Sequence, residues 1–438
     1  MRLPPFDRRS VIVALLFASA VLPAAAQKAT LTPLKPSGIY GLGERAGWTV
    51  TLPAGTPVPA GGFTYALREN DLALLKSGTL DLAAGPATVG ATVNEPAMLY
   101  LTVSPAAAPE ERSVAGAAVA PEQLQPAVLR PADFDAFWAA KLEALAAVPI
   151  DPVVTPGESG RDGVEYATFK LNNVDGAHVY GQLAKPARPG RFPALVIFQW
   201  ASPPYPLQKP WVTDRAAEGW LALDVEPHDI PCDLPPAFYA ALPQMIKNYT
   251  TVYNDDRNRC YFLQMYLGDC RALEYLKTRP DWDGKMIVVT GTSMGGQQSL
   301  CVAGLDPQVT GLVVNEPAGC DADAVLYGRS ASYPNWDASN PKVMATALYF
   351  DPVNFASRIK ARCMVAIGFV DQTAAPAGIW TAFNQIPGPK EAVPLIDSPH
   401  NNLATADQQR PWTERSAAWL AALVRGAEPP PPSGRAVP

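Results

Sequence analysis

Hydrophobic and polar residues alternate with a period of two along the first part of the chain. WTVTL, FTYAL, LALLKSGTLDL and AMLYLTV follow this alternation, and clusters of glycine and proline separate them. Residues 27–104 are therefore expected to form a small all-β domain, an immunoglobulin-like sandwich. Residues 105–126 are rich in alanine and proline, a composition typical of a linker.

From residue 127 onward the pattern changes to strands that alternate with helices. PADFDAFWAAKLEAL places aromatic and leucine side chains at helical spacing. Continuous apolar runs are typical of buried parallel strands, and they occur in PALVIFQW, GWLALDVE, KMIVVTG, VTGLVVNEP and CMVAIGFVD. Residues 127–426 are thus predicted to form an α/β domain with a doubly wound, mostly parallel sheet. The proline-rich residues 427–438 are predicted to be a disordered tail.

The first 26 residues have the pattern of an export signal. Arg2, Arg8 and Arg9 precede the apolar segment VIVALLFASAVL, and three alanines, residues 24–26, form a small-residue cleavage site. The apolar segment is too short for a membrane-spanning helix. The sequence therefore predicts a periplasmic or extracellular protein, and leaves the general and the twin-arginine export routes open.

Composition restricts the function further. The formal net charge of −6 argues against nucleic-acid binding, which requires a basic surface. The six cysteines permit disulfides in an exported protein, but they lack the spacing of a zinc site, and we predict no metal and no cofactor. There are three histidines, His178, His228 and His400, so a catalytic histidine must be one of these.

The strongest chemical signal is the segment KMIVVTGTSMGG. A buried strand leads into Gly291, Ser293 and Gly295 in the pattern GxSxG, and an apolar helix follows. This strand, turn and helix context is typical of the nucleophile elbow of α/β-hydrolases. The turn is so tight that small residues must flank the serine, and the helix N-terminus directs N–H groups toward a developing oxyanion. We therefore predict that Ser293 is a nucleophile.

A serine nucleophile needs a base and an acid, and in this fold they follow it in the order acid, then histidine. His400 is the one histidine after Ser293, and it lies between the last predicted strand and the last predicted helix. Asp371, at the end of CMVAIGFVD, is the predicted acid. Glu316, at the end of VTGLVVNEP, is the alternative acid, because it ends the strand before.

The remaining candidate residues concern the oxyanion and the substrate. Met294 follows the nucleophile and is expected to supply one backbone N–H; Trp200, after PALVIFQW, is expected to supply the other. Trp200, Tyr205 and His228 are candidates for substrate binding. Packing in the core would explain these aromatic residues equally well.

The chain also resembles the acetyl xylan esterase and cephalosporin C deacetylase family. The resemblance lies in PADFDAFWAAKLEAL, in DCRALEYLKTRPDWDGKMIVVTGTSMGGQQSL and in YFDPVNFASRIKARCMVAIGFVDQTAAPAG, and it covers roughly residues 127 to 425. It implies an α/β-hydrolase that deacetylates acetylated sugars with Ser293, Asp371 and His400. Thr292 and Met294 replace the family's usual glycine and glutamine, and Gln199-Trp200-Ala201 replaces its usual His-Gly-Tyr.

The function expected from the sequence is therefore a serine esterase that removes acetyl groups from carbohydrates such as xylan or xylo-oligosaccharides through an acetyl-enzyme. Two alternatives stay open: a peptidase of the prolyl-oligopeptidase kind, and a non-catalytic carbohydrate-binding protein on a hydrolase scaffold. The former usually carries a propeller domain, for which about 80 β residues are too few. Homo-oligomerisation also stays open.

Overall fold

The computed structural model describes residues 28–202, 206–232 and 234–431. The predicted export signal lies outside these residues, as does the end of the predicted tail. Of the tail, residues 427–431 are described, and the Pro430 carbonyl accepts a hydrogen bond of 2.6 Å from Arg415. No helix in the described ranges is long and apolar enough to cross a membrane.

The N-terminal region forms two β-sheets that enclose a common apolar core. One sheet has the strand order β1-β3-β6 and the other β2-β8-β7-β4-β5. Both contribute to this core, for example Trp48 from one sheet and Leu101 from the other. The strands are β1 (Thr30–Pro33), β2 (Ile39–Tyr40), β3 (Arg45–Thr51), β4 (Phe63–Glu69), β5 (Ala73–Leu80), β6 (Ala87–Thr92), β7 (Ala97–Pro105) and β8 (Ser113–Val119). The all-β character agrees with the sequence pattern, whereas the immunoglobulin-like topology stays a prediction.

The linker predicted at residues 105–126 is wrong, because this segment contains β8. This strand pairs antiparallel with β7 and lies inside the five-stranded sheet. Its sequence, SVAGAAV, consists of small residues that look like a linker. They are small because the strand is covered on both faces: Ala117 faces the β-domain core and Ala118 the core of the α/β domain. A short 3-10 helix, η1 (Pro121–Gln123), then leads into the α/β domain.

The α/β domain is built on a nine-stranded sheet with the order β17-β16-β15-β14-β12-β13-β11-β10-β9. The pairs from β13 through β12 to β17 are parallel, and β9, β10 and β11 add an antiparallel edge. The strands are β9 (Val153–Gly157), β10 (Val164–Asn172), β11 (His178–Pro186), β12 (Phe192–Phe198), β13 (Leu221–Val225), β14 (Trp282–Thr292), β15 (Gly311–Asn315), β16 (Arg362–Gly368) and β17 (Lys390–Leu395). This is the doubly wound, mostly parallel sheet that the sequence predicts.

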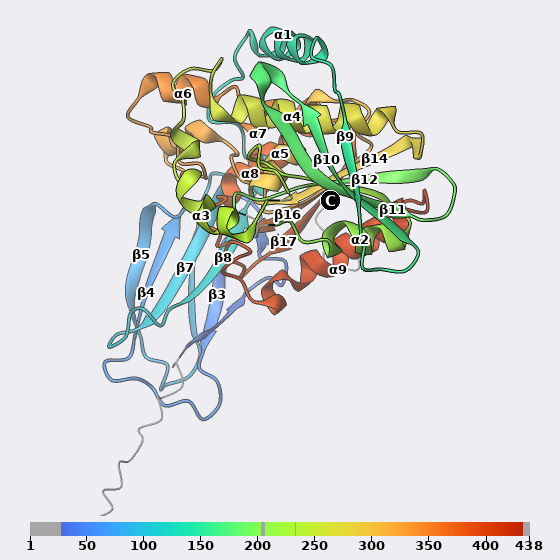
Figure 1. The fold of residues 1–438 in the computed structure, drawn as a ribbon. Helices are drawn as coiled ribbons and strands as arrows, with labels where there is room; N and C mark the ends of the chain where they lie inside the picture. The colour runs from blue at the N-terminus through green and yellow to red at the C-terminus, as the bar shows by residue number, and fades with distance from the viewer. Residues whose placement is uncertain (1–27, 203–205, 233, 432–438) are drawn as a thin grey trace, which may run out of the picture.

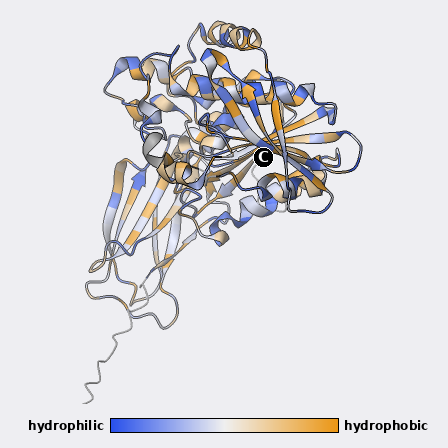
Figure 2. Ribbon diagram, viewed as in Figure 1, coloured by the Kyte–Doolittle hydropathy of each residue, from blue (hydrophilic) through white to orange (hydrophobic). Residues whose placement is uncertain are grey.

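Helices cover both faces of this sheet, as Figure 1 shows. One face packs against α2 (Pro210–Glu218) and α9 (Ala406–Leu423) through a core that includes Leu195 and Val288. The neighbouring residues Val196 and Val289 point into the larger core on the other face. There the helices are α1 (Phe134–Ala146), α4 (Tyr261–Thr278), α5 (Met294–Leu305), α6 (Pro341–Ala347), α7 (Pro352–Ala356) and α8 (Pro376–Gln385). Because both faces are buried, apolar residues predominate on both faces of the central strands, which are largely orange in Figure 2.

The N-terminal β-domain packs directly on the loops that follow β16 and β17 of the α/β domain, and this contact joins the two domains. In β7, Tyr100 points into the large α/β core, whereas its neighbour Leu101 points into the β-domain core. The Gly116 N–H in β8 donates a hydrogen bond of 3.2 Å to the Ile396 carbonyl. A Cβ at Gly116 would lie 2.6 Å from both the Cβ and the carbonyl oxygen of Phe369. Only glycine permits this backbone approach.

The close contact of Gly116 predicts that a single methyl group destabilises the protein. We expect Gly116→Ala to lower the free energy of unfolding by about 1–3 kcal/mol, the usual cost of overpacking. Urea denaturation checks this. Gly41→Ala is the matched control, since its new Cβ would lie 3.8 Å from its nearest neighbour, the Glu44 carboxylate. Equal stability of the Gly116 and Gly41 variants would contradict the tight junction.

Candidate active site

Ser293 lies in a sharp turn between β14 and α5. Its φ of 58° and ψ of −122° belong to a region that costs a non-glycine residue about 1–3 kcal/mol, and such strain is concentrated at functional sites. A Cβ at Gly291 would collide with the Gly295 backbone, and a Cβ at Gly295 would collide with the Phe198 carbonyl. The two glycines of GxSxG are thus required for the approach of α5 to the ends of β14 and β12.

Three predicted residues meet at the carboxyl ends of three parallel strands. His400 Nε2 lies 2.9 Å from Ser293 Oγ, and His400 Nδ1 lies 2.7 Å from Asp371 Oδ2. Asp371 follows β16 and His400 follows β17, so strands at the same sheet edge carry the groups. Because Asp371 accepts at Nδ1, Nε2 is left to accept the Ser293 proton, the arrangement that serine nucleophiles use.

The other oxygen of Asp371 is fixed by its own loop. Asp371 Oδ1 accepts backbone hydrogen bonds from Thr373 N at 2.7 Å and from Ala374 N at 2.8 Å. Both oxygens of this 1% exposed residue are therefore directed, one toward the loop and one toward His400. These hydrogen bonds hold the carboxylate in the orientation that faces His400.

Glu316, the alternative acid, lies close to His400 but does not hydrogen-bond to it. Its Oε2 is 3.9 Å from His400 Nδ1 and accepts the Asn401 N–H at 2.7 Å. Its Oε1 accepts the Gln409 amide at 2.9 Å. Burial and the neighbouring charge of Asp371 raise the pKa of Glu316 to about 8, although these two hydrogen bonds act in the opposite direction. The geometry therefore favours Asp371 as the acid.

The pKa of His400 reflects two opposing influences. Burial lowers it, but the hydrogen bond with Asp371 and the charges of Asp371 and Glu316 raise it, and the net pKa lies above the ordinary 6.5. In the described residues, these three side chains also place ligand-type atoms within 4.8 Å of one another, a spacing that could hold a metal ion. The carboxylate oxygens already accept the protein hydrogen bonds described above, which favours a hydrogen-bonded relay over a metal site.

The predicted oxyanion donors lie on two adjacent segments. Met294 is the first residue of α5, where a helix N–H has no partner inside the helix. Its side chain is buried, and its sulfur lies 3.3 Å from the hydroxyls of both Tyr249 and Tyr333. These two tyrosines hydrogen-bond to each other, and no sequence motif indicated them. Trp200 is in the loop that follows β12, next to the strand that ends at the elbow.

The predicted substrate-binding residues have different surroundings. The Trp200 indole is partly exposed, packs against Trp211 with ring centroids 5.3 Å apart, and donates to the Ser202 carbonyl. Tyr205 lies outside the described residues. His228 is only 8% exposed, and both ring nitrogens lie within hydrogen-bonding distance of protein atoms. It therefore has no ring nitrogen left for a sugar hydroxyl, and its role must be sought in the contacts it makes.

The geometry predicts different consequences for the two buried carboxyls. Asp371→Asn should lower kcat by about 10⁴, because an amide cannot hold the histidine tautomer that accepts the serine proton. Glu316→Gln should lower kcat less than roughly tenfold, since Glu316 makes no hydrogen bond to the imidazole. Steady-state hydrolysis of p-nitrophenyl acetate measures both. A reversed order of the two losses would make Glu316 the acid.

The pKa of His400 predicts the acid limb of the pH profile. The base must be neutral to accept a proton, and its pKa lies above 6.5, so activity should decline as the pH falls through a midpoint above 6.5. The pH dependence of kcat/KM checks this. A midpoint well below 6.5 would show that the charges of Asp371 and Glu316 do not outweigh burial.

Comparisons with known proteins find similarity to esterases over most of this chain. The acetyl xylan esterase (AXE1) family model matches residues 122–212 and 243–416. Acetyl esterase Axe7A of Xylanibacter ruminicola is 29% identical over 369 residues, which cover 81% of this chain and 82% of that protein. The acetyl xylan esterase from Paenibacillus sp. R4 has a similar fold, with a TM-score of 0.58, 23% identity, and coverage of 69% of this chain and 98% of that one.

A second solved structure has the same relationship to this chain. Acetyl xylan esterase 1 from Thermoanaerobacterium sp. JW/SL YS485 superposes with a TM-score of 0.57 and 20% identity, over 69% of this chain and 97% of that one. Nearly the whole length of each solved protein is thus matched by about two thirds of this chain. The similarity in structure establishes an α/β-hydrolase fold.

Proposed function

The chain belongs to the acetyl xylan esterase family and is a carboxylic ester hydrolase, and we propose that it removes acetyl groups from acetylated carbohydrates, xylan or xylo-oligosaccharides in particular. The observation that carries the proposal is the hydrogen-bonded series Asp371, His400 and Ser293 at a strained strand-to-helix turn. The name of the relative Axe7A, an acetyl esterase, supports acetate as the acyl group.

The proposed reaction has two halves. Ser293 Oγ attacks the acetyl carbonyl carbon while His400 Nε2 takes its proton, and Asp371 stabilises the imidazolium that results. The C–O bond to the sugar then breaks, and the sugar oxygen leaves with the proton from His400. A water molecule attacks the acetyl-enzyme in the same way, so that acetate leaves and Ser293 regains its proton. The backbone N–H groups of Met294 and Trp200 stabilise the oxyanion in both halves.

The remaining parts of the proposal concern location and substrate contact. Export to the periplasm or the cell exterior, as the first 26 residues predict, would place the enzyme where polysaccharides are found. Trp200 and Tyr205 are the proposed contacts with sugar rings, since aromatic faces pack well against the apolar faces of sugars. The partly exposed Trp200 indole is consistent with this role.

Removal of the nucleophile tests the proposal directly. Ser293→Ala should lower kcat by about 10⁴–10⁶ on p-nitrophenyl acetate and abolish acetate release from acetylated xylo-oligosaccharides. Ser416→Ala is the control and should keep full activity, because Ser416 is a partly exposed serine in α9 whose hydroxyl donates to the Thr413 carbonyl in the same helix. Wild-type rates in the Ser293 variant would refute a serine esterase. If Ser293→Ala loses the p-nitrophenyl acetate activity but the wild-type protein releases no acetate from any carbohydrate, the proposed substrate class is refuted.

A further inference from the structure

The loop that carries the proposed oxyanion donor Trp200 is held by buried side chains on both sides. Gln199, before Trp200, is 1% exposed and donates its amide to Asp224 Oδ1 at 2.5 Å. The Gln199 carbonyl accepts a hydrogen bond of 2.8 Å from the amide of Gln298 in α5. The segment is thereby tied to β13 on one side and to the nucleophile helix on the other.

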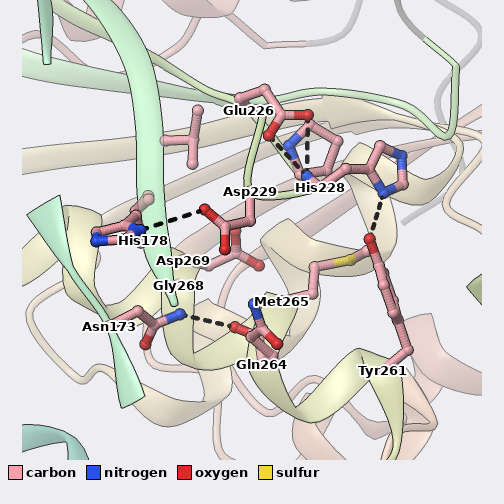
Figure 3. Close-up of a pocket in the computed structure, with 13 residues that line it drawn as sticks. Asn173, His178, Glu226, His228, Asp229, Tyr261, Gln264, Met265, Gly268 and Asp269 are labelled. Atoms are coloured by element: carbon pink, nitrogen blue, oxygen red, sulfur yellow. Dashed lines mark hydrogen bonds and ion pairs between the residues drawn. The ribbon is translucent and has the colours of Figure 1, made fainter. Parts of the chain in front are cut away.

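The residue after Trp200 is held by a histidine. His228 Nε2 lies 3.0 Å from the Ala201 carbonyl oxygen, and His228 Nδ1 lies 2.9 Å from the Tyr261 hydroxyl. A carbonyl oxygen can only accept, so Nε2 must carry the hydrogen, and in the neutral ring Nδ1 then accepts from Tyr261. Burial lowers the pKa of His228 to about 4, which keeps the ring neutral in this tautomer. Figure 3 shows the imidazole directed toward the Tyr261 hydroxyl.

The backbone of His228 is itself fixed. The Glu226 carboxylate accepts the His228 N–H at 2.9 Å with each of its oxygens (Figure 3). It also accepts the Ile230 N–H at 2.6 Å. Glu226 is 3% exposed, so these bonds lie in a buried setting where hydrogen bonds to a carboxylate are strong. The imidazole therefore projects from a rigid loop at the end of β13.

His228 also contacts the other side of the proposed oxyanion hole. Its ring lies edge-on to Tyr249, with centroids 4.8 Å apart, and the Tyr249 hydroxyl lies 3.3 Å from Met294 Sδ. One histidine thus touches the segment next to Trp200 and the aromatic side chain that packs on Met294. These are the two residues whose N–H groups we assign to the oxyanion.

From these contacts we propose that His228 is a positioning residue that fixes the Trp200 N–H in the oxyanion hole by holding the Ala201 carbonyl. This inference rests on the proposed function. The loop of residues 226–231, which follows β13, then acts in the acceleration of the reaction rather than in contact with the sugar. Displacement of a preorganised donor by about 1 Å can cost roughly 10²-fold in rate, so the histidine needs no contact with substrate to matter.

The test compares His228→Ala with His228→Gln in the full-length protein. His228→Ala removes the donor to Ala201, and kcat on p-nitrophenyl acetate should fall roughly 10- to 100-fold with KM within about twofold. Methylboronic acid, whose tetrahedral adduct places an oxygen in the oxyanion hole, should bind more weakly by a similar factor. His228→Gln keeps an N–H donor at this position and should recover most of both losses.

His178→Ala is the matched control. His178 lines the same pocket as His228 (Figure 3), but its Nδ1 faces Asp229 at 3.9 Å and it lies on β11. This variant should keep wild-type kcat and wild-type inhibition. Tyr261→Phe removes the hydroxyl at Nδ1 and retains the ring packing, and it should give a smaller loss of the same kind. It also decides the question if His228→Ala fails to fold.

The outcomes separate this inference from the proposed function. Wild-type kcat and boronic acid affinity in His228→Ala, with Ser293→Ala inactive, would overturn the positioning role alone. Equal losses in His228→Ala and His228→Gln with unchanged boronic acid affinity would also overturn it, because a general structural role predicts that result. Full activity in Ser293→Ala would instead overturn the proposed function.

Discussion

The close approach of α5 to the end of β12 is the constraint on which the site depends. No side chain fits at Gly295, because its Cβ would lie 2.0 Å from the Phe198 carbonyl oxygen. This contact brings the nucleophile turn next to the segment that carries Trp200, so the two proposed oxyanion donors follow the adjacent strands β14 and β12. It also forces Ser293 into a strained backbone conformation, which the hydrogen bond from its N–H to the Asn315 carbonyl at 3.0 Å helps to hold.

The β-domain also helps to hold the proposed active site, because it contacts the loop that carries Asp371. Its strand β8 packs against Phe369, two residues before Asp371, and accepts no side chain at Gly116. The turn between β4 and β5 contacts the next part of this loop, where Gln372 donates to Asp71 Oδ2 at 2.6 Å. The loop that carries the proposed acid is therefore enclosed between two domains. The N-terminal region is part of the folded unit, because Tyr100 belongs to the α/β core.

The sequence predicts the parts of this structure that follow from local chemistry. The elbow is recognisable because its glycines and its serine occupy consecutive positions, and His400 is recognisable because histidine is rare in this chain. The strand β8 is missed because small residues in a linker and small residues in a tightly covered strand have the same composition. In β8, Gly116 must stay small because it lies against Phe369, which is more than 200 positions away in the sequence. No local sequence pattern contains that contact.

The same limit applies to His228, whose buried position cannot be predicted from its neighbours in sequence. Because His228 is buried, it does not bind the substrate directly. Its contact with the Ala201 carbonyl depends on the packing of β13 beside β12. Beside His400, the buried carboxyl groups of Asp371 and Glu316 place oxygen atoms within 4.8 Å of each other. Two buried carboxyls this close cannot both be charged without a large penalty. Their surroundings differ: Asp371 accepts two backbone N–H groups and faces His400 Nδ1, whereas burial and the charge of Asp371 raise the pKa of Glu316 to about 8.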